Sequence, residues 1–125
     1  MIRGIRGATT VERDDEPLIL AASEALLQEM ISKNDIDPKR VASLFFSVTA
    51  DLRAAFPSKV MRKFTDWKFV PIMNMQEIPV AGSLPHCIRV MIHVDTDREQ
   101  ESIKHVYRNG AVSLRPDLNQ MEQEL

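Results

Sequence analysis

Two arginines lie inside segments whose other residues are typical of β-strands. Arg6 is part of the segment at residues 2–11, and Arg89 lies in the middle of residues 87–96. A guanidinium in a strand interior is costly unless it is paired or faces a polar cavity. Because arginine binds carboxylates in a planar, bidentate way, the two together favour a site for a small molecule with several negative charges.

Structural explanations for these arginines stay open at this point. An edge strand would leave the side chains in water, and Glu77 or Asp95 could form a purely structural ion pair with them. Gly4 and Gly7 flank Arg6, and glycines inside a strand often mark a close approach to the backbone. We therefore expect space for a ligand beside Arg6.

Other catalytic chemistries have little support. His86, His93 and His105 lack the spacing of a zinc site, and no cluster of acidic residues completes a ligand set. The lone Cys87 adjoins an apolar run, which indicates a buried, inert thiol. The chain has no glycine-rich phosphate loop and no Gly-x-Ser-x-Gly elbow, and nothing local supports a serine triad. We expect no metal and no cofactor.

Length and composition narrow the class of protein. The 125 residues fit one domain, which we place at residues 1–118, with a mobile tail at 119–125. The net charge of -2 argues against a nucleic-acid binder, which would normally be basic. Ten of the 16 basic residues are arginines, the residue type that binds carboxylates in a bidentate way. No apolar stretch is long enough to cross a membrane and the first residues do not resemble a signal peptide, so we expect a cytoplasmic protein.

The apolar patterns predict a mixed α/β domain with parallel and antiparallel strand pairs. The clearest alternation lies in residues 87–96, where Arg89 is on the face opposite a row of branched residues, Ile88, Val90, Ile92 and Val94. Strands are also predicted at residues 2–11, 41–49, 67–75 (interrupted by Pro71), 105–107 and 111–114. Helices are predicted from the Asp14-Asp15-Glu16-Pro17 start to about residue 33 and at 56–64, with a helical turn at 97–104 and a loop at 77–85.

Several short segments resemble one enzyme family in the same order and spacing over nearly the whole chain. They are residues 3–12 (RGIRGATTVE), 49–52 (TADL), 55–57 (AFP), 75–77 (MQE), 82–84 (GSL), 88–90 (IRV), 105–107 (HVY) and 114–118 (LRPDL). The combination is similar to the monofunctional, trimeric chorismate mutases of the pseudo-α/β-barrel type. That resemblance implies a pseudo-barrel fold assembled as a homotrimer, with three equivalent clefts that are each lined by two neighbouring chains.

The resemblance also implies the reaction, the rearrangement of chorismate to prephenate in phenylalanine and tyrosine biosynthesis. It makes Arg89 the main catalytic cation and Glu77 the acceptor of a hydrogen bond from the ring hydroxyl. The remaining implied substrate contacts come from Arg6 and Tyr107 at the carboxylate or ether-side oxygens and from Phe56 at the pocket wall. The resemblance further implies that Arg62 helps to bring the C-terminal segment, with Leu114 and Arg115, over the cleft. Met73 and Asn74 depart from the family pattern, which commonly has small polar residues or cysteine there, although Asn74 can still bind a hydroxyl.

Two other functions remain open on the sequence. A non-catalytic trimer that binds a small anionic metabolite would need Arg6 and Arg115, but not Arg89 and Glu77 together. The small trimeric imine deaminases have a similar size and architecture, but their sequence signatures are not found here. For single residues, Glu77 could be a solvated loop carboxylate and Tyr107 an interface packing residue.

Overall fold

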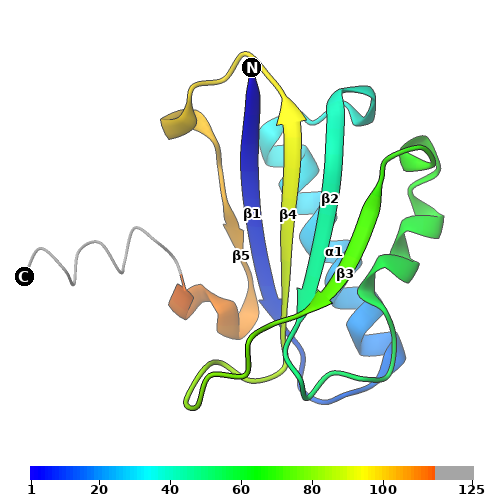
Figure 1. The fold of residues 1–125 in the computed structure, drawn as a ribbon, viewed down its shortest axis with the longest axis vertical. Helices are drawn as coiled ribbons and strands as arrows, with labels where there is room; N and C mark the ends of the chain where they lie inside the picture. Colours follow the sequence, from blue (N-terminus) through cyan, green and yellow to red (C-terminus); the bar gives the residue numbers. More distant parts are fainter. Residues whose placement is uncertain (115–125) are drawn as a thin grey trace, which may run out of the picture.

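The computed structural model describes residues 1–114, which form a mixed five-stranded sheet with one long helix against it (Figure 1). The strand order is β3-β2-β4-β1-β5, with β1 at Ile2–Thr10, β2 at Val41–Val48, β3 at Ile72–Gln76, β4 at Cys87–Asp95 and β5 at Val106–Tyr107. β4 is antiparallel to β1 and β2, whereas β2 pairs with β3 and β1 pairs with β5 in parallel. The carboxyl ends of β1, β2, β3 and β5 therefore meet the start of β4 at one end of the sheet. The predicted mixed α/β class is confirmed.

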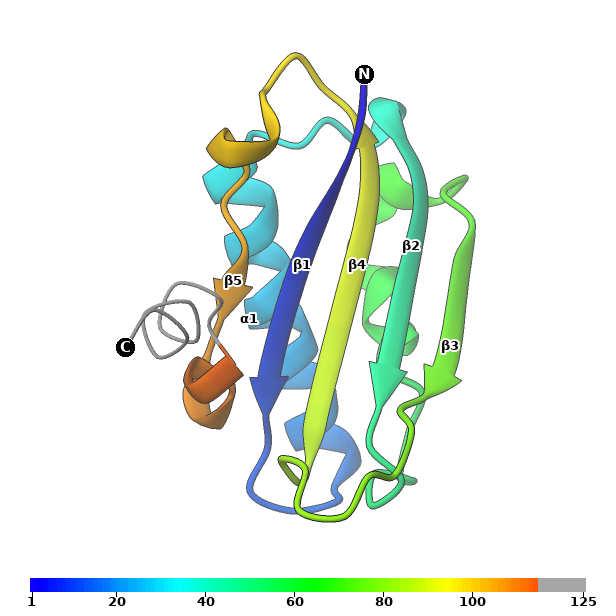
Figure 2. The ribbon, with the colours of Figure 1, turned by 60° about the vertical axis from the view of Figure 1, so that its left-hand side comes forward.

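Helix α1, at Glu16–Asn34, covers one face of the sheet (Figure 2). Its start follows the predicted signals, because the Asp15 side chain accepts a hydrogen bond from the Leu18 amide at 3.2 Å and Pro17 lies in the first turn. It ends at Asp35, which takes the left-handed conformation with φ of 49°. The core lies between α1 and the sheet, and it contains the predicted row on β4, Ile88, Val90, Ile92 and Val94.

Gly7 lies on the face of β1 that meets this helix. A Cβ there would lie 3.1 Å from Leu26 Cδ1 and closer still to Met30 Sδ. Gly7 therefore lets the helix approach the strand, which stabilises the core by close packing. The expectation that this glycine leaves space for a ligand is wrong.

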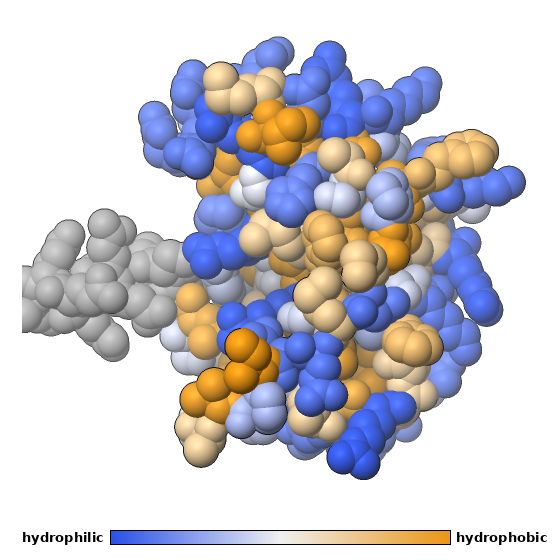
Figure 3. Space-filling view, viewed as in Figure 1, coloured by the Kyte–Doolittle hydropathy of each residue, from blue (hydrophilic) through white to orange (hydrophobic). Residues whose placement is uncertain are grey.

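The other face of the sheet has no helix against it in the described chain. Apolar side chains gather over the middle of this open face and over the loop after β3, interrupted by charged groups (Figure 3). Large exposed apolar residues of these segments are Ile2, Met73, Met75, Ile78 and Val80. An exposed apolar area of this kind is typical of a surface that associates with another protein chain.

Three predicted elements differ from the structure. Residues 56–64 form a 3-10 helix, η2 at Pro57–Lys63, and the predicted strand at 67–75 begins only at Ile72, because η3 at Thr65–Trp67 and Pro71 precede it. Residues 111–114 belong to a 3-10 helix, η5 at Asn109–Leu114, instead of a strand. The Thr10 hydroxyl accepts the Gly110 amide at 2.9 Å, and the Ala111 amide bonds to the Arg108 carbonyl, so the chain turns there.

The remaining short elements are 3-10 turns, η1 at Pro38–Arg40 and η4 at Gln100–Ser102, of which η4 lies inside the predicted helical turn. Within residues 1–114, no helix combines the length and apolar character that spanning a bilayer requires. The expected tail at 119–125, and the end of the expected domain at 118, lie outside the described residues.

Candidate active site

Arg89 and Glu77 meet at the end of the sheet where β3 finishes and β4 begins. Arg89 Nε lies 3.3 Å from Glu77 Oε2, and the same carboxylate oxygen accepts a hydrogen bond from Ser47 Oγ at 3.2 Å. The Arg89 side chain is 44% exposed and that of Glu77 is 31% exposed, so both remain accessible to a ligand. This pair, with Ser47, forms a charged, half-open group on the open face.

Strand register brings these residues together. Ser47 on β2 and Ala8 on β1 are the two cross-strand partners of Arg89, so Arg89 lies between a hydroxyl and a methyl group. Glu77 directly follows β3, and its amide donates to the Val48 carbonyl at 2.8 Å, which continues the β2–β3 pairing by one residue. The Arg89–Glu77 pair is therefore mounted on backbone that is fixed by the sheet.

Arg6 and Tyr107 lie on the same open face, next to this pair. Arg6 precedes by two residues the β1 position that faces Arg89, and Tyr107 of β5 pairs with Ala8. We call Arg6, Glu77, Arg89 and Tyr107 the strand-end cluster. It holds two guanidinium groups against one carboxylate, so it suits a ligand that carries more than one negative charge.

A small apolar cluster supports Tyr107. Ala8, Cys87 and Ala111 are buried there, with Tyr107, Leu84 and Leu114 packed against them. Burial raises the pKa of the Cys87 thiol, although the charge of Arg89 acts in the opposite direction. Cys87 is therefore a buried packing residue, as predicted. Leu114 lies near the strand-end cluster, whereas Arg115 lies outside the described residues.

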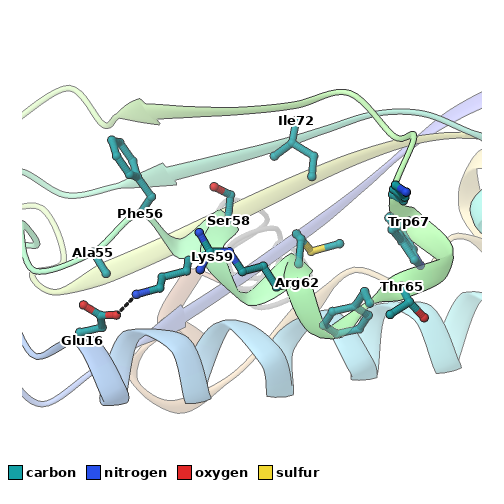
Figure 4. A pocket seen from close by; sticks show the side chains of 12 residues that line it. Glu16, Ala55, Phe56, Ser58, Lys59, Arg62, Thr65, Trp67 and Ile72 are labelled. Carbon is teal, nitrogen blue, oxygen red and sulfur yellow. Dashed lines mark hydrogen bonds and ion pairs between the residues drawn. The ribbon is translucent and has the colours of Figure 1, made fainter.

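Phe56 and Arg62 line a different hollow, a pocket of about 700 Å³ beside η2 (Figure 4). Phe56 is 72% exposed, and Ser58, Lys59 and Ile72 are further lining residues. Lys59 is ion-paired with Glu16 of α1. We call Phe56, Lys59 and Arg62 the turn pocket, because short 3-10 turns carry it. An aromatic ring beside two cations suits a planar anion.

Met73 and Asn74 point to opposite faces of β3. Asn74 is directed toward η2, where its Oδ1 accepts the Ser58 amide at 3.3 Å and its Nδ2 donates to Ser58 Oγ at 2.7 Å. Its amide is thus engaged in bracing β3 against η2. Met73 is 58% exposed on the open face, opposite Phe45 of β2. The proposed contact of Asn74 with a ligand hydroxyl would require it to leave Ser58.

The turn pocket lies beside β3 on the helix side of the sheet, whereas the strand-end cluster lies on the open face. The 3-10 helix η2, which contains Arg62, lies beside β3 at one edge of the sheet, and η5, which ends at Leu114, follows β5 at the other edge (Figures 1 and 2). Four strand spacings separate these edges, or about 19 Å. The expected approach of Arg62 to the C-terminal segment therefore does not occur within the described part of a single chain.

Ser47, beside the strand-end cluster, and Lys59, in the turn pocket, are polar residues that were not predicted as site residues. Ser47 becomes a partner of Glu77 only through strand register, although its place next to Phe46 in a predicted strand does put it on the opposite face. Lys59 lies three residues before Arg62, a spacing that places both side chains on one side of the predicted helix and could have indicated its place in the turn pocket.

Comparisons with known proteins agree with one another. The family described as chorismate mutase type I matches residues 2–118. Chorismate mutase AroH of Bacillus subtilis is 50% identical over 119 residues, covering 95% of this chain and 94% of that protein. Chorismate mutase AroH of Thermus thermophilus is 44% identical over 119 residues, with 94% and 97% covered. The solved structure of a chorismate mutase from Clostridium thermocellum is 47% identical in sequence and superposes with a TM-score of 0.86. The match covers 89% of this chain and 98% of that one.

Proposed function

The chain belongs to the type I chorismate mutase family, and on that basis we propose that Arg89 and Glu77 are the catalytic pair that rearranges chorismate to prephenate. The protein is an isomerase of aromatic amino acid biosynthesis, so the alternatives of a non-catalytic binder and an imine deaminase are set aside. The observation that carries the proposal is the position of Arg89, fixed on β4 and half-exposed beside Glu77. The cytoplasm remains our proposal for its location.

The reaction explains why a fixed cation is useful. The rearrangement is pericyclic and needs no proton transfer or nucleophile, so an enzyme accelerates it by holding a compact substrate conformation and by stabilising the charge that develops. Negative charge grows on the ether oxygen as its bond to carbon breaks. An arginine guanidinium is a permanent cation in proteins, and one aimed at that oxygen binds the transition state more tightly than the ground state.

Glu77 has the chemistry to hold the ring hydroxyl of the substrate. Its Oε2 already accepts a hydrogen bond from a hydroxyl, that of Ser47, at 3.2 Å. A second hydroxyl can bind to the other oxygen, since an ionised carboxylate offers about four acceptor sites. In this proposal Arg6 and Tyr107 bind the substrate carboxylates or ether-side oxygens, and the charge of Glu77 keeps Arg89 in place.

We further propose that each cleft combines the strand-end cluster of one chain with the turn pocket of a neighbour in a homotrimer. The positions of the two groups support this arrangement: the turn pocket lies on the helix side of the sheet and the strand-end cluster on the open face, so a small substrate cannot touch both in one chain. The exposed apolar residues of the open face support it as well, since contact between chains would bury them. Residues Phe56 and Arg62 would then reach a substrate that is bound to Arg89 of the next chain.

The first experiment follows the ultraviolet absorbance of chorismate after purified protein is added without cofactor or metal, with prephenate confirmed chemically. We expect rapid conversion that a chelator does not inhibit. Sedimentation of the same sample tests the trimer independently. Conversion by a monomeric species would contradict the shared cleft, and no conversion by folded protein would contradict the catalytic assignment of Arg89 and Glu77.

A further inference from the structure

The backbone amide of Arg6 is bound by a side chain. The Arg6 amide donates to Nδ1 of His105 at 2.9 Å, and His105 immediately precedes β5, which carries Tyr107. The imidazole thus joins the two strands that contribute Arg6 and Tyr107 to the strand-end cluster.

The pairing of β1 with β5 explains why a side chain is needed here. Gly7 pairs with Val106 and Ala8 with Tyr107 in parallel, and the Arg108 amide donates to the Ala8 carbonyl at 2.9 Å. Continued by one step, this ladder would place the Lys104 carbonyl opposite the Arg6 amide. That carbonyl instead accepts Asn34 Nδ2 of α1 at 2.8 Å, and the Lys104 amide donates to Asn34 Oδ1 at 2.8 Å. The chain is drawn toward the helix, and the His105 ring replaces the missing backbone acceptor.

We propose that His105 is a positioning residue whose neutral ring fixes Arg6 and Tyr107 relative to each other for substrate binding, an inference that rests on the proposed function of these two residues. The ring can accept the Arg6 amide only while Nδ1 carries no proton. Protonation turns the acceptor into a donor, so two N–H groups then face each other and the contact is lost. Acid thus loosens the start of β5 and weakens substrate binding.

The surroundings of the ring favour the neutral form. Desolvation, followed by the positive charge of Arg6, lowers the pKa of His105 from its ordinary value. On α1, the neutral Asn34 meets this segment, and Glu29 is bound to Arg108 and Lys33. Lys104 and Arg108 add only positive charge from the segment itself. No carboxylate among residues 1–114 forms an ion pair with His105, and such a partner would have raised its pKa.

Kinetics against pH test the proposal, with each of the three histidines of the chain replaced in turn by asparagine. For the wild type we expect KM to rise as pH falls through the His105 pKa, below about 6.5, while kcat changes less. His105→Asn keeps an acceptor oxygen at the δ position and cannot be protonated in this range, so its KM should stay low from pH 8 to pH 5. His86→Asn and His93→Asn are matched controls that should keep the wild-type acid limb. His105→Ala should raise KM about threefold to tenfold even at pH 8.

Nuclear magnetic resonance of the wild-type imidazoles gives a readout that does not depend on any variant folding. We expect the His105 ring to carry its proton on Nε2 and to titrate together with the kinetic acid limb. A proton on Nδ1 at pH 8, a ring that titrates away from that limb, or an acid limb that persists in His105→Asn would overturn the proposal.

The variant Arg6→Ala distinguishes a failure of the positioning role of His105 from a failure of the proposed substrate role of Arg6. An unchanged KM in Arg6→Ala would overturn the substrate role of Arg6 itself. A raised KM in Arg6→Ala, combined with a wild-type KM in folded His105→Ala at pH 8, would overturn the positioning role of His105 alone.

Discussion

The strand-end cluster and the turn pocket differ in how the fold holds them. Arg6 and Arg89 project from strands that are paired on both sides, and the backbone of Glu77 is bonded to β2. Phe56 and Arg62 lie at η2, whose 3-10 turns have weaker hydrogen-bond geometry than a sheet, and Phe56 is largely exposed. One group is built on rigid backbone, and the other is mounted on short turns at the edge of the sheet.

This difference indicates a division of work between the two groups. Stabilising a transition state requires charges that are fixed before the reaction, because reorganisation during the reaction would cost free energy. The strand-end cluster meets that requirement. The turn pocket offers an aromatic surface and cations that can adjust, which suits substrate binding and exclusion of water. Substitutions in the two groups should therefore affect different kinetic constants.

The largest effect is expected from Arg89. In the proposed mechanism, Arg89→Ala removes the charge beside the developing ether oxygen, and loss of one such preorganised donor costs about 3 kcal/mol or more. We expect kcat/KM to fall by more than about a hundredfold, mainly through kcat. Arg89→Lys should restore activity only partly, because a point charge lacks the planar fork. Wild-type turnover by folded Arg89→Ala would show that Arg89 is not the catalytic cation.

Glu77→Gln should have the next largest effect. Glutamine keeps an acceptor oxygen but loses the charge that faces Arg89 at 3.3 Å. Hydrogen bonds to charged groups contribute about 1.5–3 kcal/mol, so we expect a tenfold to hundredfold loss of kcat/KM, roughly. Steady-state kinetics at neutral pH measure it. A loss below about twofold would mean that Glu77 is a solvated loop carboxylate.

Arg62→Ala should alter binding more than turnover. We expect KM to rise about tenfold while kcat changes by less than about threefold, because Arg62 in the proposed cleft binds the substrate away from the ether oxygen. Lys63→Ala is the matched control, since Lys63 points to Glu24 of α1 instead and its exposed ion pair contributes little. A large fall of kcat in Arg62→Ala would contradict the assignment of substrate binding to the turn pocket and of transition-state stabilisation to the strand-end cluster.

Mixing these variants tests whether the groups come from different chains. Oligomers assembled from Arg89→Ala and Arg62→Ala subunits would contain some clefts with an intact strand-end cluster from one chain and an intact turn pocket from its neighbour. At substrate concentrations well below KM, where activity follows kcat/KM, we expect such mixtures to be more active than either parent. Activity that never exceeds the more active parent would place both groups of one cleft in the same chain.

The smallest effect concerns Asp51, on the connection between the two groups. Desolvation raises the pKa of Asp51, but hydrogen bonds from Thr49 Oγ1 and the His86 amide outweigh it, so the net shift is downward. A lowered carboxyl pKa contributes stability that is present above the ordinary pKa, near 4, and is lost as pH falls through the lowered value. We expect Asp51→Asn to cost less than about 1 kcal/mol at pH 7, because the group is partly exposed, and to reduce the loss of stability below about pH 4. Chemical denaturation at pH 7 and below about pH 4 measures the free energy of unfolding of the wild type and of Asp51→Asn. The same pH dependence in both proteins would contradict a stabilising role of the Asp51 carboxylate.

Period-two patterns made the central strands predictable. The alternation in β4 placed Ile88, Val90, Ile92 and Val94 in the core and Arg89 on the opposite face, and the structure confirms it. Short segments were less predictable, since three or four residues contain too little periodicity to distinguish a strand from a turn. Residues 111–114 became a 3-10 helix because Thr10, about a hundred residues earlier, holds the Gly110 amide.

The sequence by itself determined the family, the mixed α/β class, the core face of β4 and the type of chemistry, because these depend on residue identity and local period. Tertiary structure alone decided which side chains meet. It brought Glu77 to Arg89 through the register of three strands, turned Asn74 toward Ser58, and used the space at Gly7 for α1. It also separated Arg62 from Leu114 by the width of the sheet. Register, strand order and helix packing are set by the balance of many non-local contacts, and no single segment of the sequence specifies that balance.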